Sequence, residues 1–197
     1  MVIGITGGIG SGKSAVVEIL KAKDLPVLSA DAISHEIMTP GSALVEKLAE
    51  VFGQDILVGE ERALDRQCLA DKAFARPENT EKLNEIVQNA IKEELSNRIS
   101  ILKYQDADQL IFAEIPLLYE AGWDDLCDKV WCITASEKVR IARVIERDGV
   151  SRRQAKMRIK RQMEEDEKTA RADVVIYNEG TLEELNEKVE KAINHMK

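Results

Sequence analysis

Long apolar runs are absent from this sequence. The first apolar stretch covers only residues 2–6 and ends in glycines, so it does not resemble a secretory signal peptide. No later run approaches the length of a membrane-spanning helix. Cysteine is also scarce, because Cys68, Cys127 and Cys132 are odd in number and form no Cys-x-x-Cys pair. These features favour free, buried thiols in a reducing compartment, and we expect a soluble, cytoplasmic protein without a membrane partner.

An excess of positive charge is lacking too. The chain of 197 residues has 28 Lys and Arg against 36 Asp and Glu, a net charge of −8 that argues against nucleic acid as a partner. Residues 138–161 are the exception. They hold ten basic and two acidic residues, so this segment carries +8 and the remainder −16. A basic island in an acidic protein indicates a local anionic ligand rather than a long polyanion.

The strongest motif lies at the N-terminus. The apolar run 2–6 is followed by Gly-x-x-x-x-Gly-Lys-Ser at 7–14 and by a helical pattern at 15–21. Strand, loop and helix in this order are typical of a phosphate-binding P-loop, whose glycines let backbone N–H groups point at phosphate oxygens. Lys13 can neutralise the β- and γ-phosphates, and the Ser14 hydroxyl can bind Mg²⁺. The sequence therefore predicts a nucleotide phosphate site, while the absence of an Asn-Lys-x-Asp string argues against a GTPase.

Apolar segments alternate with helical patterns along the chain, which predicts an α/β fold with a mostly parallel five-stranded sheet. We expect strands at 2–6, 25–28, 109–114, 129–134 and 174–176, and helices at 15–21, 32–38, near 42–52, 78–104, 137–147, 151–168 and 182–196. The stretch 53–65 is rich in turns and poor in strands. About eighty mostly helical residues separate the second and third strands, too many for a simple crossover. We interpret 32–105 as a helical substrate-binding insertion.

Two carboxylates stand at expected strand ends, where ligands bind in open α/β sheets. Asp31 could accept a proton from a substrate hydroxyl or hold that hydroxyl in line with the γ-phosphate, although an Asp there is equally consistent with a helix N-cap. Glu114 could bind Mg²⁺ through water, or be an ordinary strand terminus. His35 and His195 are interpreted as surface or packing residues.

The basic segment predicts a lid. Arg140, Arg143 and Arg147 fall at i, i+3 and i+7, on one face of a helix, and Arg158 and Arg161 share a face of the next. A basic helical hairpin with few acidic partners suits a mobile lid that closes over a triphosphate. The alternative is a solvated helix face.

The motifs together resemble one family. They are Thr6–Ser14, then 30–35 with Pro40-Gly41, then Leu64-Asp65-Arg66, then 115–120 (Ile-Pro-Leu-Leu-Tyr-Glu), the basic lid, Gln162, 172–176 and Asn178-Glu179-Gly180. In order and spacing this chain resembles dephospho-CoA kinase, a P-loop kinase of coenzyme A biosynthesis that phosphorylates the ribose 3′-hydroxyl of dephospho-CoA. The resemblance implies a P-loop NTPase three-layer fold. It divides one domain into a nucleotide-binding core (1–31, 106–136, 169–197), the insertion 32–105 and a lid (137–168).

The resemblance also implies roles for single residues. ATP and dephospho-CoA are the expected substrates, Mg²⁺ the cofactor and a monomer the expected state. The expected catalytic residues are Asp31, Lys13, Arg143 and Arg147. Those expected to bind ATP are Gly8, Gly10, Ser11, Gly12, Lys13, Ser14, Ala15, Arg147 and, near adenine, Asn178. Those expected on the dephospho-CoA side are Asp31, His35, Arg66, Pro116, Leu117, Leu118 and Arg140. Ser14 and, through water, Glu114 are the expected metal ligands.

Four positions depart from the family pattern. Ser29 replaces the first Asp of Asp-Ala-Asp, Ala15 replaces Thr, Glu114 replaces Asp, and Gln88-Asn89 replaces a His-Pro pair. These changes affect ATP affinity and the surroundings of the metal more than the reaction. Two further hypotheses stay open: a P-loop kinase for another small metabolite or nucleotide, and a slow ATP-dependent switch protein.

Overall fold

The computed structural model describes residues 1–196, which form two compact units. Unit 1 comprises Met1–Ser29 and the chain from Ile101 onward, and unit 2 comprises Ala30–Ser100. Each unit has its own buried apolar cluster. The interpretation of unit 2 as a substrate-binding insertion stays a prediction.

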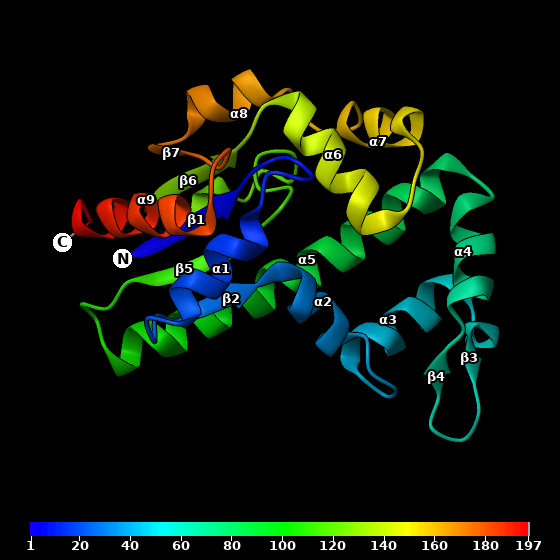
Figure 1. Cartoon of the computed structure of the whole chain (residues 1–197). Helices are drawn as coiled ribbons and strands as arrows, with labels where there is room; N and C mark the ends of the chain where they lie inside the picture. Colours follow the sequence, from blue (N-terminus) through cyan, green and yellow to red (C-terminus); the bar gives the residue numbers. More distant parts are fainter. Residues whose placement is uncertain (197) are drawn as a thin grey trace. The chain divides into compact units, whose positions relative to one another are not determined.

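Unit 1 is built on a five-stranded sheet in the order β2-β5-β1-β6-β7, with all neighbours parallel (Figure 1). The sheet confirms the predicted α/β fold. Because neighbouring strands run parallel, the carboxyl ends of β1 and β5 lie at the same edge, where Ile5 is in register with Glu114. The strands are β1 (Val2–Thr6), β2 (Val27–Ser29), β5 (Ile111–Glu114), β6 (Lys129–Thr134) and β7 (Val174–Tyr177).

One face of this sheet is covered by the first and last helices, α1 (Lys13–Lys21) and α9 (Leu182–Asn194). Figure 1 shows α9 running beside the sheet close to β7. The two helices bury apolar residues against the strands because their apolar positions recur at helical spacing. The buried members include Ile3, Ile5, Val16, Leu20, Trp131, Ile176, Leu185 and Val189.

The loop after β5 packs directly on β1. A Cβ at Gly4 would lie 2.7 Å from both Leu118 Cδ1 and Cys127 Sγ, so only glycine allows this approach. Leu118 and Trp123 are buried in this loop. The remaining elements of unit 1 are the 3₁₀ turn η2 (Asp124–Leu126), α6 (Glu137–Asp148), α7 (Arg152–Ile159) and α8 (Glu165–Arg171).

Unit 2 is helical, with one short hairpin. Ser42 caps α3 by accepting a hydrogen bond from Val45 N, and Asp65 caps α4 by accepting from Gln67 N and Cys68 N. The helices bury Leu48, Phe52, Ile56 and Ala73 among others. The elements are α2 (Ala30–Ile37), α3 (Ala43–Phe52), η1 (Gln54–Ile56), β3 (Leu57–Val58), β4 (Ala63–Leu64), α4 (Arg66–Phe74) and α5 (Pro77–Gln105), whose last residues belong to unit 1.

The stretch 53–65 is turn-rich, as predicted, with only the short hairpin β3–β4. One local prediction was wrong: the expected helix 151–168 is two helices, α7 and α8, separated by residues 160–164. Ser151 and Gln154 begin α7 with a capping box, as a helix start there requires. The interruption has a tertiary cause, because Gln162 and Met163 bond to distant groups, Ile9 N and Glu120, instead of continuing the helix.

In residues 1–196, no helix has both the length and the apolar character that a bilayer-spanning segment needs. The three cysteines are free, as predicted, but only Cys132 is buried, whereas Cys68 and Cys127 are half-buried. Burial raises the pKa of the Cys127 and Cys132 thiols to about 12, so both are protonated at neutral pH.

Candidate active site

The phosphate loop joins β1 to α1 at the carboxyl edge of the sheet, and its shape depends on glycine. Gly10 and Gly12 have φ of +78° and +95°. Lys13 opens α1 directly after Gly12, so the positive end of the helix dipole points into the loop. A Cβ at Gly12 would lie 2.0 Å from Asn178 Nδ2, and one at Gly10 would lie 2.6 Å from Arg140 O. The loop is therefore packed closely between α6 and the segment after β7.

Lys13 folds back over this loop. Its Nζ donates to Gly7 O at 2.8 Å and to Gly8 O at 3.3 Å. Burial lowers the pKa of Lys13 to about 8, with the nearby Glu114 carboxylate opposing the shift and Lys168 adding to it. An ammonium held here by neutral carbonyls can exchange those contacts for phosphate oxygens, which are stronger acceptors because they are charged.

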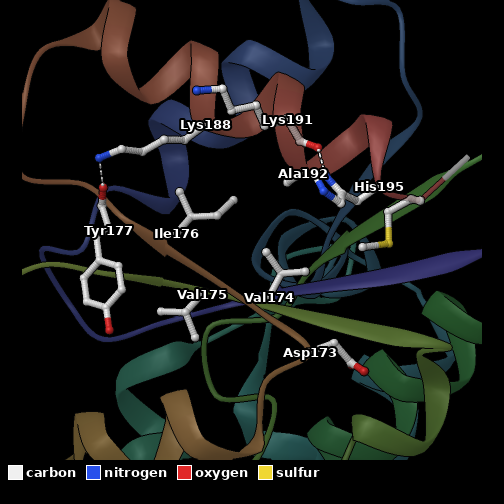
Figure 2. A pocket seen from close by; sticks show the side chains of 10 residues that line it. Asp173, Val174, Val175, Ile176, Tyr177, Lys188, Lys191, Ala192 and His195 are labelled. Carbon is white, nitrogen blue, oxygen red and sulfur yellow. Dashed lines mark hydrogen bonds between the residues drawn. The ribbon is translucent and has the colours of Figure 1, made fainter.

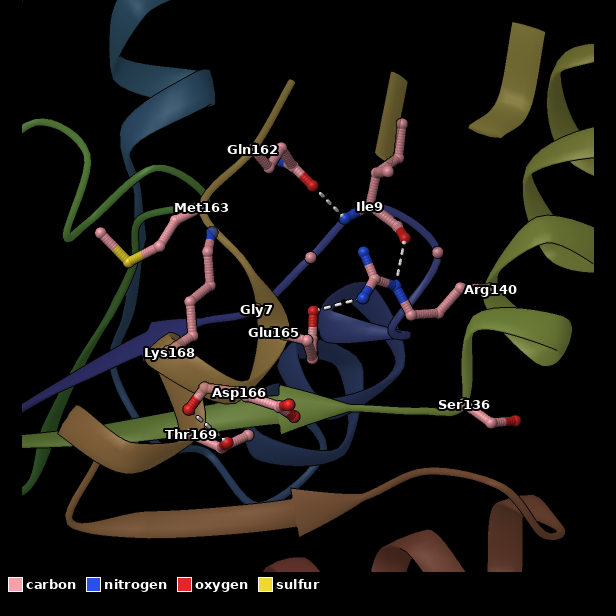
Figure 3. Close-up of polar contacts among 12 residues, drawn as sticks. Gly7, Ile9, Ser136, Arg140, Gln162, Met163, Glu165, Asp166, Lys168 and Thr169 are labelled. Atoms are coloured by element: carbon pink, nitrogen blue, oxygen red, sulfur yellow. Dashed lines mark hydrogen bonds and ion pairs between the residues drawn. The ribbon is translucent and has the colours of Figure 1, made fainter. Parts of the chain in front are cut away.

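Arg140 belongs to the loop's support. It is only 5% exposed, its Nε donates to Ile9 O at 3.1 Å, and its guanidinium forms an ion pair with Glu165. Figure 3 shows the Arg140 side chain between Ile9 and Glu165. Arg140 therefore supports the loop through these bonds, and its expected place on the acceptor side stays a prediction.

Arg143 and Asn178 also bond to backbone carbonyl groups of the phosphate loop. Arg143 donates to Gly10 O at 3.4 Å and to Ser11 O at 3.3 Å, and lies 3.5 Å from Asn178 Oδ1. Asn178 is 7% exposed and its Nδ2 donates to Ser11 O at 2.9 Å. Arg143, one of the expected catalytic residues, therefore lies at the loop, and Asn178 supports the loop's backbone.

Arg147 does not share this position. Its side chain is 62% exposed and donates to both carboxylate oxygens of Asp148, and Asp148 Oδ2 also accepts from Arg158 at 2.6 Å. Of the three arginines expected on one helix face, Arg140 and Arg143 contact the phosphate loop and Arg147 does not. The arginines of residues 137–168 have more acidic partners than the sequence suggested, since Asp148 and Glu165 lie at helix ends where they meet arginines from other helices, and the role of this segment as a lid stays a prediction.

Two oxygen ligands suited to Mg²⁺ stand at the loop. Ser14 is exposed in the first turn of α1, and the half-buried Glu114 ends β5. Glu114 Oε2 accepts a hydrogen bond from Ser29 Oγ at 3.0 Å. Ser29, which is itself one of the departures from the family pattern, therefore orients this carboxylate. A hydroxyl and a carboxylate fit Mg²⁺, which binds few protein ligands and takes the rest from phosphates and water. Residues 1–196 contain no cluster of three or more His, Cys, Asp or Glu that could hold a metal ion.

The residues expected on the acceptor side are divided between the units. In unit 1, Leu117 is exposed while Leu118 is fully buried, and Pro116 O accepts from Thr6 Oγ1 at 3.3 Å. Leu117 is therefore the member of this stretch that offers a side chain to a ligand. In unit 2, Asp31 and His35 are exposed on α2, and Arg66 is exposed at the start of α4.

Sequence reasoning assigned no role to four residues that meet at the loop: Glu120, Gln162, Glu165 and Lys168. The first two lie in motifs that carry the family resemblance, and that was their only signal. Glu165 and Lys168 lie in a charged stretch whose sequence is typical of a solvated helix face, yet Lys168 is fully buried.

A separate hollow of about 760 Å³ lies between β7 and α9, at the outer edge of the sheet (Figure 2). Its lining is mainly apolar, with Lys188 and Lys191 on α9 and His195 directly after it, and Lys188 donates to Tyr177 O at 2.7 Å. Its one carboxylate, Asp173, is already bonded to Lys129 and Val130 N. The groups that suit phosphate chemistry lie at the loop instead.

Comparison with known proteins agrees with this site. A family model described as dephospho-CoA kinase matches residues 1–184. The dephospho-CoA kinase of Syntrophotalea carbinolica is 40% identical over 189 residues, covering 96% of this chain and 89% of the relative. That of Corynebacterium glutamicum is 38% identical over 191 residues, covering 97% and 94%.

Solved structures give the same result. TT1252 from Thermus thermophilus matches with a TM-score of 0.81 at 36% identity, covering 100% of this chain and 97% of the other. Dephospho-CoA kinase from Campylobacter jejuni matches with 0.74 at 28% identity, covering 99% and 96%. Shikimate kinase from Aquifex aeolicus matches with a TM-score of 0.51 at 14% identity, covering 98% of this chain and 96% of the other, and shows a shared fold alone. On the family match and these relatives, the chain belongs to the dephospho-CoA kinase family.

Proposed function

We propose that the protein transfers the γ-phosphoryl group of ATP to the ribose 3′-hydroxyl of dephospho-CoA, giving coenzyme A and ADP. The observation that carries this is the phosphate loop, on which Lys13 and Arg143 converge at the carboxyl edge of the sheet. Family membership supports the choice of acceptor.

In the reaction, the acceptor oxygen forms a bond to the γ-phosphorus while the bond to the β–γ bridging oxygen breaks, and the hydroxyl proton passes to Asp31. Lys13 releases the carbonyls of Gly7 and Gly8 and neutralises the phosphates. Arg143, already at the loop, adds positive charge, and Arg147 joins it after leaving Asp148. Ser14 and, through water, Glu114 would hold Mg²⁺, which would supply charge neutralisation at the phosphates.

The domain roles belong to the same proposal. Unit 2 serves as the dephospho-CoA-binding insertion, with His35 and Arg66, and residues 137–168 serve as the lid, as the resemblance implies. Leu117 would contact the acceptor from unit 1. Three free cysteines support a reducing, cytoplasmic environment. We further propose that the enzyme acts as a monomer.

The test is ADP release from Mg·ATP with and without dephospho-CoA, with adenosine, AMP and shikimate as alternative acceptors. We expect stimulation by dephospho-CoA alone, with coenzyme A as the product. Stimulation by another acceptor would replace the substrate in this proposal. Slow hydrolysis that no acceptor stimulates would favour an ATP-dependent switch.

A further inference from the structure

The connection between α7 and α8 reaches the phosphate loop and holds one residue of it. Gln162 Oε1 accepts from Ile9 N at 2.7 Å, and Arg140 Nε donates to Ile9 O at 3.1 Å. Both backbone polar groups of Ile9 are thus bonded to side chains more than 100 residues away in sequence (Figure 3). Two directional bonds on one residue restrict how the loop can turn at that point.

A buried ion pair holds this connection in place. Glu120 Oε1 accepts from Met163 N at 3.1 Å and lies 2.6 Å from Lys168 Nζ. Lys168 has no exposed side-chain surface, while the Glu120 side chain is 22% exposed. Figure 3 shows Lys168 extending to Met163, next to Gln162. Lys168, Glu120, Met163, Gln162 and Ile9 therefore form a continuous series of contacts.

Burying the ammonium group of Lys168 is energetically unfavourable. Removing such a charge from water costs several kcal/mol, and an apolar side chain of similar volume is often as stable or more so. A stability role alone therefore explains poorly why a lysine stands here. Glu120, the carboxylate that pairs with Lys168, also bonds to Met163, the residue next to Gln162. The ion pair therefore helps to fix the position of Gln162.

We propose that Lys168 is a positioning residue for ATP: by holding Glu120 it fixes Gln162, and so keeps Ile9 and the phosphate loop in the shape that binds the triphosphate. This inference rests on the proposed use of the loop for ATP, but not on the identity of the acceptor. The positive charge of Lys168 also contributes to the lowered pKa of Lys13, which is consistent with its place beneath the loop.

The test compares Lys168→Met with a matched control, Lys129→Met. Lys129 pairs with Asp173 at 2.8 Å, and Asp173 also accepts a backbone N–H, from Val130, so the control likewise removes a lysine whose carboxylate partner bonds to the backbone, here with a lysine side chain that is 46% exposed. The readouts are the Kd of Mg·ATP by calorimetry, the KM of each substrate and the Tm. We expect the Kd and KM for ATP to rise about tenfold in Lys168→Met, the magnitude of a lost charged hydrogen bond, with the KM for dephospho-CoA unchanged. Lys129→Met should leave all three constants unchanged.

Two further variants test the series of contacts. Gln162→Met leaves the ion pair intact and should also weaken ATP binding, which keeps the inference testable if Lys168→Met does not fold. Adding Glu120→Gln to Lys168→Met should weaken ATP no further, because both act through one contact. An unchanged ATP Kd in folded Lys168→Met or in Gln162→Met, or equal rises in both KM values, would overturn the inference. If wild type binds ATP but does not phosphorylate dephospho-CoA, the proposed function fails while the Kd comparison still decides this one.

Discussion

Replacing Gly12 by alanine tests the packing of the phosphate loop against Asn178. Two costs add. A non-glycine residue at φ +95° costs about 1–2 kcal/mol in backbone strain. The new Cβ would also lie 2.0 Å from Asn178 Nδ2, so the buried amide must move and lose its bond to Ser11 O. An unsatisfied buried polar group costs about 1–3 kcal/mol, which brings the sum to about 2–5 kcal/mol.

Both costs destabilise the loop conformation that we propose to bind phosphate. The affinity for Mg·ATP should therefore fall at least about 30-fold, the equivalent of 2 kcal/mol. The control is Gly122→Ala. Gly122 has φ of +65° and no atom within 4 Å of the added Cβ, so that change introduces strain without a clash. It should lower the Tm and leave the ATP Kd unchanged. Calorimetric titration with Mg·ATP and thermal unfolding of both variants make the comparison.

A second variant separates the clash from the strain. Asn178→Ala removes the atom that the new methyl group meets, so adding Gly12→Ala to it should cost only the strain, about 1–2 kcal/mol. The reasoning would be refuted if folded Gly12→Ala bound ATP like wild type. It would also be refuted if the two substitutions were simply additive, because the clash would then not be the source of the loss.

Three other predictions concern the chemistry. Asp31→Asn should keep the ATP Kd and lose most of the turnover with dephospho-CoA; unchanged turnover would remove Asp31 from the mechanism. The pKa of Lys13 is lowered to about 8, chiefly by burial, so its ammonium is present below that pH and lost above it. The kcat/KM for ATP should therefore fall about tenfold per pH unit above 8, and Lys13→Ala should abolish this dependence. Asp148→Asn frees Arg147 from its ion pair and should leave the ATP Kd unchanged or tighter; weaker binding would show that the pair itself matters.

The sheet and the phosphate loop could be predicted because each depends on local sequence. Five short apolar runs became five parallel strands, because the central strands β1, β5 and β6 are largely buried and the half-buried edge strands β2 and β7 still pack apolar residues against the core. The helix after the loop begins at Lys13, as the glycine-rich motif requires. These features follow from residues near one another in the chain, where periodicity and glycine content are informative.

The surroundings of the loop could not be predicted in the same way. Arg140, Arg143 and Arg147 are equivalent by helical spacing, yet Arg140 is buried, Arg143 bonds to the loop and Arg147 is exposed. What separates them is the position of their partners: Glu165, which pairs with Arg140, lies on α8, whereas Asp148, which pairs with Arg147, is the last residue of α6 itself and also binds Arg158 of α7. Likewise, the break between α7 and α8 is caused by contacts of Gln162 and Met163 with distant residues. Tertiary partners of this kind leave no periodic signal.

The choice of acceptor must depend on residues outside the loop. Shikimate kinase shares the fold at only 14% identity, and the fold alone does not determine which acceptor is phosphorylated. Lys13, Arg143 and Asn178 bond to the backbone of the phosphate loop, which we propose to bind ATP, so these contacts do not act on the acceptor. We expect specificity to come from groups such as Arg66 in unit 2 and the exposed Leu117 in unit 1. Exchanging Arg66 for methionine should accordingly raise the KM for dephospho-CoA and leave the ATP Kd unchanged, the reverse of the pattern expected for Lys168→Met. A rise in the ATP Kd instead would place Arg66 on the nucleotide side.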